Sequence, residues 1–259
     1  MQNYKKIVLK IGSSLISENK SLSYKRIKEL SEQVVKIIKT GKEFIIVTSG
    51  AISQGQNLLN IKNKPKDLDS LQALAAIGQQ QLMGMYENSF SNFDVLTAQV
   101  LLTHDDMNNA DRYLNAKATI GKILKLGVIP IINENDVVAT DEIKFGDNDT
   151  LAAMVANLVG ADLMIILTDQ NGFFDKNPDL NKDATLIKKC NIDEIKVSDY
   201  DSSSKNKFGT GGFTTKIEAV KVAAKSGTTS IVTSGYTKDV LNKIFDGEEI
   251  GTIFLPNKK

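Results

Sequence analysis

Short apolar runs alternate with helix-like segments along the whole chain. Strands are predicted where apolar residues are nearly continuous, as they are in strands buried on both faces. These runs are 7–12, 44–50, 95–102, 128–133, 163–168 and 230–233. Helices are predicted where apolar residues recur at helical spacing. These segments are 24–40, 68–90, 112–126, 150–159 and 215–226. The alternation predicts an α/β fold, with a mainly parallel sheet covered by helices on both faces.

Two segments modify this expectation. Pro130 lies inside a predicted strand, and proline cannot donate to a strand ladder, so it is the main local objection to that strand. Residues 171–208 are the least apolar stretch, and we expect a hairpin and mobile loops there, over an active site. No linker or repeat divides the chain. We therefore expect one unit, 1–259, with a functional boundary near residue 150.

Composition excludes several classes of protein. The 32 basic and 31 acidic residues of the 259 nearly cancel, which gives no broad cationic field to hold nucleic acid or an anionic membrane. With one cysteine, Cys190, no internal disulfide can form, and with one histidine, His104, a structural zinc site is not expected. We assign Cys190 no role and expect His104 to be a surface or hinge residue. The start of the chain resembles no secretion signal, and no apolar run is long enough to span a membrane, so we expect a cytoplasmic protein.

Small, polar or charged residues follow most of the predicted strands. Ligands of open α/β sheets bind beyond the carboxyl ends of the strands, so these tips are candidate site residues, although any single tip is also an ordinary turn. Lys10 is more informative, because a lysine within an apolar strand is costly to bury without a counter-charge. The alternative is an edge strand that leaves Lys10 in water.

The segment 209–216, Gly-Thr-Gly-Gly-Phe-Thr-Thr-Lys, leads into a predicted helix. Glycines allow close backbone approach, a helix N-terminus presents free donors, and Lys216 adds a positive charge, which together suit a phosphate. The segment matches neither the dinucleotide fingerprint nor the Walker loop. A flexible loop capped by Thr214 is the alternative.

Two acidic and amide-rich stretches are further candidates. In 146–150, Asp149 could cap the following helix, hold lysines in place or contribute to a magnesium site. In 133–136, Asn-Glu-Asn-Asp follows an apolar strand and suits a small zwitterion, with Asp136 available to an ammonium group.

Taken together, these segments resemble the amino acid kinase family, and within it the branch that phosphorylates the side-chain carboxylate of L-glutamate. The resemblance covers essentially the whole chain, in order. The matching stretches are 8–14, 47–52, 130–136, 144–149, 167–172 and 209–216.

The resemblance implies a three-layer αβα sandwich, and transfer of the γ-phosphoryl group of ATP, with Mg²⁺, to L-glutamate as the first step of proline synthesis. It implies that Lys10 and Lys216 stabilise the transferred group while Asp149 holds both lysines, and that Lys144 lies near the reaction centre. The residues implied to bind glutamate are Ser49, Gly50, Asn133, Asp136 and Asn148. Those implied to bind ATP are Lys10, Thr168, Asp169, Thr210, Gly211, Gly212, Phe213, Thr214, Thr215 and Lys216.

The resemblance also implies a homodimer or homotetramer and feedback inhibition by proline. Many members of this branch continue into a C-terminal PUA domain. The sequence stops at Lys259, so we expect that domain to be absent, and no RNA contact. The rival hypotheses are a related kinase acting on N-acetylglutamate, aspartate, carbamate or UMP, a non-catalytic nucleotide-binding regulator, and an RNA-binding module.

Overall fold

A computed structural model describes residues 4–18, 21–139, 148–176, 178, 181–194 and 213–257. Its centre is an eight-stranded sheet in the order β10-β12-β11-β7-β1-β4-β6-β5. The strands, in chain order, are β1 (Lys6–Ile11), β4 (Glu43–Val47), β5 (Thr97–Leu102), β6 (Ile129–Glu134), β7 (Leu163–Thr168), β10 (Lys189–Asn191), β11 (Thr229–Ser234) and β12 (Thr252–Leu255). In the described part of this sheet, only the β11–β12 pair is antiparallel. The predicted fold class, a mainly parallel α/β sheet, is confirmed.

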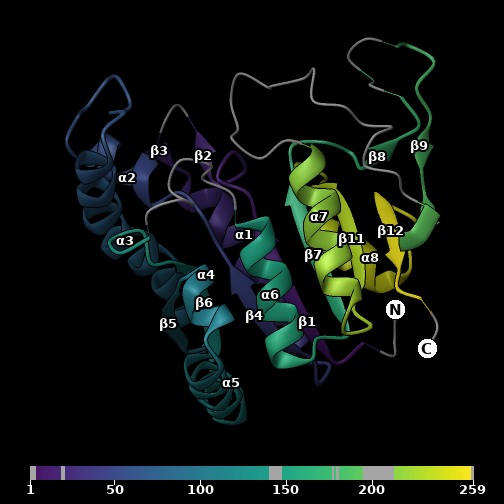
Figure 1. Ribbon diagram of the computed structural model, residues 1–259, viewed down its shortest axis with the longest axis horizontal. Coiled ribbons are helices and arrows are strands. Elements are labelled where there is room, and N and C mark those ends of the chain that lie inside the picture. Colours follow the sequence, from purple (N-terminus) through teal and green to yellow (C-terminus); the bar gives the residue numbers. More distant parts are fainter. Residues whose placement is uncertain are drawn as a thin grey trace.

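Helices cover both faces of the sheet. The helices packed on one face are α1 (Tyr24–Ile38), α2 (Ala51–Leu58), α3 (Leu68–Ser91) and α8 (Val240–Asp246). Those on the other are α4 (His104–Asn108), α5 (Ala110–Lys125), α6 (Asp149–Val159) and α7 (Phe213–Ala224). In Figure 1, α6 and α7 lie side by side in front of the sheet. The result is the three-layer αβα sandwich that the sequence resemblance implied.

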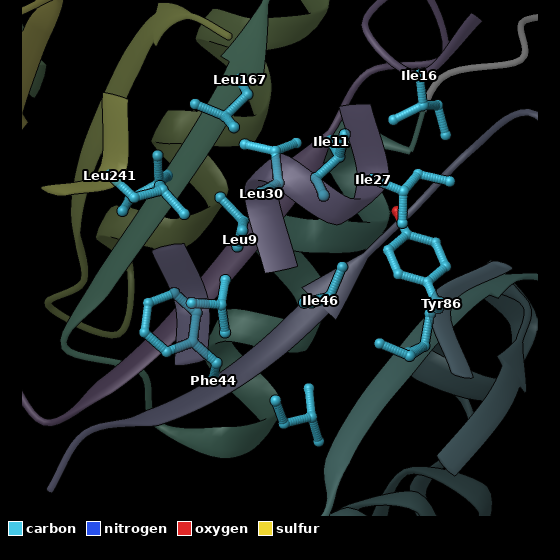
Figure 2. Close-up of a cluster of buried hydrophobic side chains, with 14 of the residues drawn as sticks. Leu9, Ile11, Ile16, Ile27, Leu30, Phe44, Ile46, Tyr86, Leu167 and Leu241 are labelled. Carbon is cyan, nitrogen blue, oxygen red and sulfur yellow. The ribbon is translucent and has the colours of Figure 1, made fainter. Parts of the chain in front are cut away.

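The central strand β1 contributes to both cores. Leu9 and Ile11 belong to the cluster that packs under α1 and α3, whereas Val8 belongs to the cluster under α6 and α7. Because strand side chains alternate between faces, Lys10 lies on the α6–α7 face. Figure 2 shows the first cluster, with labelled residues from β1, α1, β4 and α3 that include Leu9, Ile11, Ile27, Leu30, Ile46 and Tyr86.

The chain builds the sheet in two halves that meet at its centre. The strands that precede residue 135 are β1, β4, β6 and β5, and they form one side of the sheet. The strands that follow it, β7, β11, β12 and β10, form the other side. The seam lies between β1 and β7, where Gly12 N donates to Leu167 O at 3.2 Å. In parallel α/β sheets, ligands bind at the point where the order of the strands reverses, as it does here.

All the predicted strands and helices are present, with ends that differ by a few residues. Pro130 is accommodated because β6 pairs with β5 along its length but with β4 only from Ile131 onward. A proline at this position therefore removes no donor from the β4 ladder. The predicted hairpin within 171–208 is confirmed as β8 (Phe173–Phe174) paired with β9 (Leu186–Ile187). The loops expected around it lie partly outside the described residues.

The α2 and α3 helices touch backbone to backbone at two glycines. A Cβ atom added at Gly78 would lie 1.9 Å from Ala51 O and 2.5 Å from Gly55 N. One added at Gly55 would lie 2.0 Å from Leu74 O. Only glycine permits this approach. The crossing fixes the start of α2, directly after the tip of β4, against the middle of α3.

No described helix combines the length and apolar character needed to cross a lipid bilayer.

Candidate active site

A buried carboxylate between two lysines lies at the seam of the sheet. Lys10 on β1 places its Nζ 2.5 Å from Asp149 Oδ1, and Lys216 in the first turn of α7 places its Nζ 3.1 Å from Asp149 Oδ2. Asp149 is fully buried, and the two lysine side chains are 7% and 12% exposed. Three elements that are distant in sequence thus meet at one cluster of charge.

The two lysines keep this carboxylate ionised. Burial favours the neutral acid, but attraction first to Lys10 and then to Lys216, with the hydrogen bonds that both donate, outweighs it and holds the pKa of Asp149 below its usual range. Asp149 is the first residue of α6, and the residue at the cap position is Asn148, whose side chain makes no capping bond. Of the three roles the sequence left open for Asp149, the geometry matches the holding of lysines.

Next to this cluster, side-chain amides form a chain of buried hydrogen bonds. Asn148 Nδ2 donates to Thr48 O at 2.5 Å and to Asn133 Oδ1 at 2.7 Å. Asn133 Nδ2 then donates to Gln79 Oε1 at 2.8 Å. The side chain of Thr48 is in turn held by a hydrogen bond between its Oγ1 and the Tyr86 hydroxyl, 2.9 Å away. The strand tips of β4 and β6 are thereby connected to α6 and α3.

Ser49 and Gly50 form the turn between β4 and α2. Ser49 is buried, and its Oγ has no hydrogen-bond partner among the described residues. Gly50, at the cap position of α2, has a φ of 103°, which side chains rarely tolerate. The turn therefore leaves a buried hydroxyl group available beside the amide chain.

Three acidic residues, Glu87, Glu134 and Asp136, line a cavity at the end of this chain of amides. The cavity has a volume of about 550 Å³, lies between α3, β5 and the loop after β6, and includes Gln79, Glu134 and Asp136 in its wall. Burial, and then the charge of Glu134, raise the pKa of Asp136 to about 7, although Lys64 acts in the opposite direction. An ammonium group in the cavity would find a carboxylate there, as the sequence predicted for Asp136.

His104, which we expected to be a surface or hinge residue, is partly exposed and lies next to an acidic side chain. It opens α4 with a side chain that is 18% exposed, and its Nδ1 lies 3.5 Å from Glu134 Oε2. The Glu134 side chain is buried, and its carboxylate oxygens accept no hydrogen bond among the described residues, so the contact with the His104 imidazole is its ion pair in the described structure.

The other candidate ATP-binding residues are only partly within the described structure. Thr168 ends β7, with its hydroxyl donating to Asp169 Oδ1 at 3.0 Å, and Thr214 and Thr215 lie in the first turn of α7. Phe213 is the first residue of α7. Lys144, Thr210, Gly211 and Gly212 lie outside the described residues.

The described residues suit a magnesium ion that is bound through nucleotide phosphates rather than by a set of protein ligands. No group of three or more His, Cys, Asp or Glu side chains in the described part of the chain is arranged to hold a metal ion. Asp149 already binds two ammonium groups. Magnesium is commonly bound through nucleotide phosphates with few protein ligands. The site therefore suits an ion that arrives with its phosphates.

The chain matches known proteins over almost its whole length. The profile of the amino acid kinase family matches residues 5–234. The chain belongs to the amino acid kinase family. This amino acid kinase is 48% identical over 257 residues to the glutamate 5-kinase of Caldanaerobacter subterraneus, and 44% identical over 254 residues to that of Methylococcus capsulatus. In both cases the match covers 98% of this chain and 68% of the relative.

Solved structures of two other kinases share the fold. UMP kinase from Bacillus anthracis superposes with a TM-score of 0.68 at 17% identity, covering 98% of this chain and 97% of the other. Carbamate kinase from Giardia lamblia bound to AMP-PNP gives a TM-score of 0.66 at 17% identity, covering 99% of this chain and the whole of the other. At this identity the likeness shows the fold alone.

Proposed function

We propose that this amino acid kinase is a glutamate 5-kinase. It transfers the γ-phosphoryl group of ATP to the side-chain carboxylate of L-glutamate, giving L-glutamyl 5-phosphate and ADP, the first step of proline biosynthesis. The observation that carries the proposal is Asp149, buried between Lys10 and Lys216 at the seam of the sheet. The relatives named glutamate 5-kinase, at 44–48% identity, support the choice of substrate.

The lysine pair suits phosphoryl transfer to a carboxylate. The acceptor is already ionised at neutral pH, so the reaction needs no general base. Negative charge spreads over the transferred group in the transition state, and catalysis is mainly positioning and fixed positive charge. Asp149 orients the two ammonium groups but neutralises only one unit of charge, so the cluster keeps a net positive charge for the phosphoryl oxygens.

We assign the two substrates to the two halves of the sheet. Glutamate binds on the first half, at Ser49, Gly50, Asn133, Asp136 and Asn148. ATP binds across the second half, at Thr168, Asp169 and the 210–216 segment, and brings Mg²⁺ with its phosphates. Lys10 and Lys216 contact the γ-phosphate from either side of the seam, and the family resemblance adds Lys144 to the residues near the reaction centre. The family resemblance further supports a cytoplasmic enzyme, a homodimer or homotetramer, and proline as feedback inhibitor.

Trapping of the product with hydroxylamine tests this function. Incubated with ATP and hydroxylamine, the protein should form a hydroxamate from L-glutamate and little or none from N-acetylglutamate or aspartate, because Asp136 selects a free ammonium group at a defined distance from the reacting carboxylate. ADP release with carbamate or UMP should stay at background. If another acid gave hydroxamate and glutamate gave none, the substrate assignment would be wrong.

The pH dependence of glutamate capture should follow Asp136. Only the ionised carboxylate pairs with an ammonium group, and its pKa of about 7 leaves it protonated in mild acid. At saturating ATP, kcat/KM for glutamate should rise about tenfold per pH unit up to pH 7 and then level off. Replacing Glu134 by glutamine removes a charge that raises this pKa, so the transition should move to lower pH. If the Asp136→Asn variant kept the same pH transition in kcat/KM for glutamate, the group that titrates would not be Asp136.

A further inference from the structure

The buried amide chain has a direction that is fixed at one end. Thr48 O is a backbone carbonyl and can only accept, so the atom of Asn148 that faces it must be the nitrogen. The second hydrogen of this nitrogen goes to Asn133 Oδ1. The amide nitrogen of Asn133 therefore points the other way, toward Gln79 Oε1. Each amide in turn has its orientation set by the previous one, and the last donor of the chain is Gln79 Nε2.

This last donor belongs to a residue that lines the cavity, and it has no acceptor among the described residues. Gln79 is 8% exposed, and its Nε2 is buried with no hydrogen-bond partner among the described residues. Buried amide donors are nearly always paired, and an unpaired one is costly. The same residue lines the cavity that contains Asp136. The amide cannot rotate to relieve the unpaired donor, because rotation would turn its nitrogen toward the nitrogen of Asn133.

We propose that Gln79 Nε2 donates a hydrogen bond to the α-carboxylate of the bound substrate. The proposal rests on the proposed function and adds a specificity-determining residue to it. In an α-amino acid the ammonium and carboxylate groups share one carbon, so their partners must line the same space, as Asp136 and Gln79 do. The opposite end of the amide chain, at Asn148, adjoins Asp149 and the lysines, where the side-chain carboxylate of the substrate would react. The amide chain thus spans the substrate from its reacting end to its α-carbon.

The position of Gln79 is rigidly determined. It follows Gly78, whose Cα lies against the backbone of α2 so closely that a Cβ would be 1.9 Å from Ala51 O. Its oxygen is held by Asn133. A donor fixed in this way is ready to bind before the substrate arrives, which favours strong discrimination against ligands that lack the matching acceptor.

Substrate analogues can test which group Gln79 recognises. 4-Aminobutyrate is glutamate without its α-carboxylate, and glutarate is glutamate without its ammonium group. In Gln79→Met, kcat/KM should fall about 10- to 100-fold for glutamate and for glutarate, as expected when a buried partner of a charged group is lost. It should change little for 4-aminobutyrate, which has no carboxylate at that position. The KM for ATP should stay near its wild-type value.

A second variant keeps the proposal testable if Gln79→Met does not fold. Gln79→Glu retains an oxygen that accepts from Asn133 but replaces the free donor with an anionic oxygen. It should penalise glutamate and glutarate more than Gln79→Met does, and should not penalise 4-aminobutyrate. An equal penalty on all three acids would mean that Gln79 only supports Asn133, and would overturn the proposal. Failure of the wild-type protein to use glutamate would instead overturn the proposed function.

Discussion

Replacing Lys10 or Lys216 by alanine lowers kcat by about a thousandfold, since fixed positive charge at a transferred phosphoryl group contributes about 10³ or more to such reactions. Both ammonium groups are held by the same buried carboxylate, at 2.5 Å and 3.1 Å. Loss of either lysine therefore removes one of the two charges that we propose to flank the transferred phosphoryl group. The measurement is kcat at saturating ATP and glutamate, with the melting temperature to show that the variant is folded.

Two lysines on or directly beside the same elements provide matched controls. Lys6 lies at the other end of β1, 30% exposed, with its Nζ donating to Val159 O. Lys225 is exposed just beyond the end of α7. Lys6→Ala and Lys225→Ala should keep wild-type turnover. The mechanism would be contradicted if Lys10→Ala and Lys216→Ala also turned over at a near-normal rate.

Gly78→Ala should reduce the free energy of unfolding by about 3 kcal/mol or more, because the added methyl group meets backbone atoms that no rotamer change can move. The nearest of these atoms, Ala51 O, would lie 1.9 Å away. The α2 and α3 helices would have to separate, which would also displace Ser49 and Gln79. Thermal unfolding should show a melting temperature roughly 6–12 °C below that of the wild type.

Gly84→Ala is the matched control, in the same helix. A Cβ atom at Gly84 has no atom within 4 Å, apart from the neighbours that any helical residue has. Alanine forms helices better than glycine, so this variant should be more stable by up to about 1 kcal/mol. If Gly78→Ala unfolded at or above the wild-type temperature, the close helix crossing would be wrong.

The regular elements could be predicted because their signals are local. Nearly continuous apolar runs mark β1, β4, β6 and β7, and apolar residues at helical spacing mark α1 and α6. The α2 helix (Ala51–Leu58) was missed, since its sequence is rich in small and polar residues and only Gly55 indicates a close packing partner. The antiparallel β12 was missed as well, because a strand of four residues gives too short a pattern.

The site was predictable where charge and position in a strand combine. Lys10 was singled out because a lysine is costly within an apolar strand, and the structure supplies the counter-charge in Asp149. Gln79 was not singled out, because one glutamine in a helix rich in glutamine carries no signal. Its importance arises only when α3 packs against the tip of β6 and brings it within 2.8 Å of Asn133. Long-range contacts of this kind cannot be inferred from spacing along one chain.

The fate of a labelled oxygen atom tests most directly whether this chain phosphorylates the side-chain carboxylate of glutamate. Glutamate carrying oxygen-18 in that carboxylate is incubated with the protein, ATP and hydroxylamine, and the inorganic phosphate is examined by phosphorus NMR. Hydroxylamine attacks the carbonyl carbon of an acyl phosphate, so the phosphate leaves with the bridging oxygen that came from glutamate. We predict one labelled oxygen in each phosphate released. Release of unlabelled phosphate would show that ATP is cleaved without transfer to the carboxylate, and would contradict the proposed function.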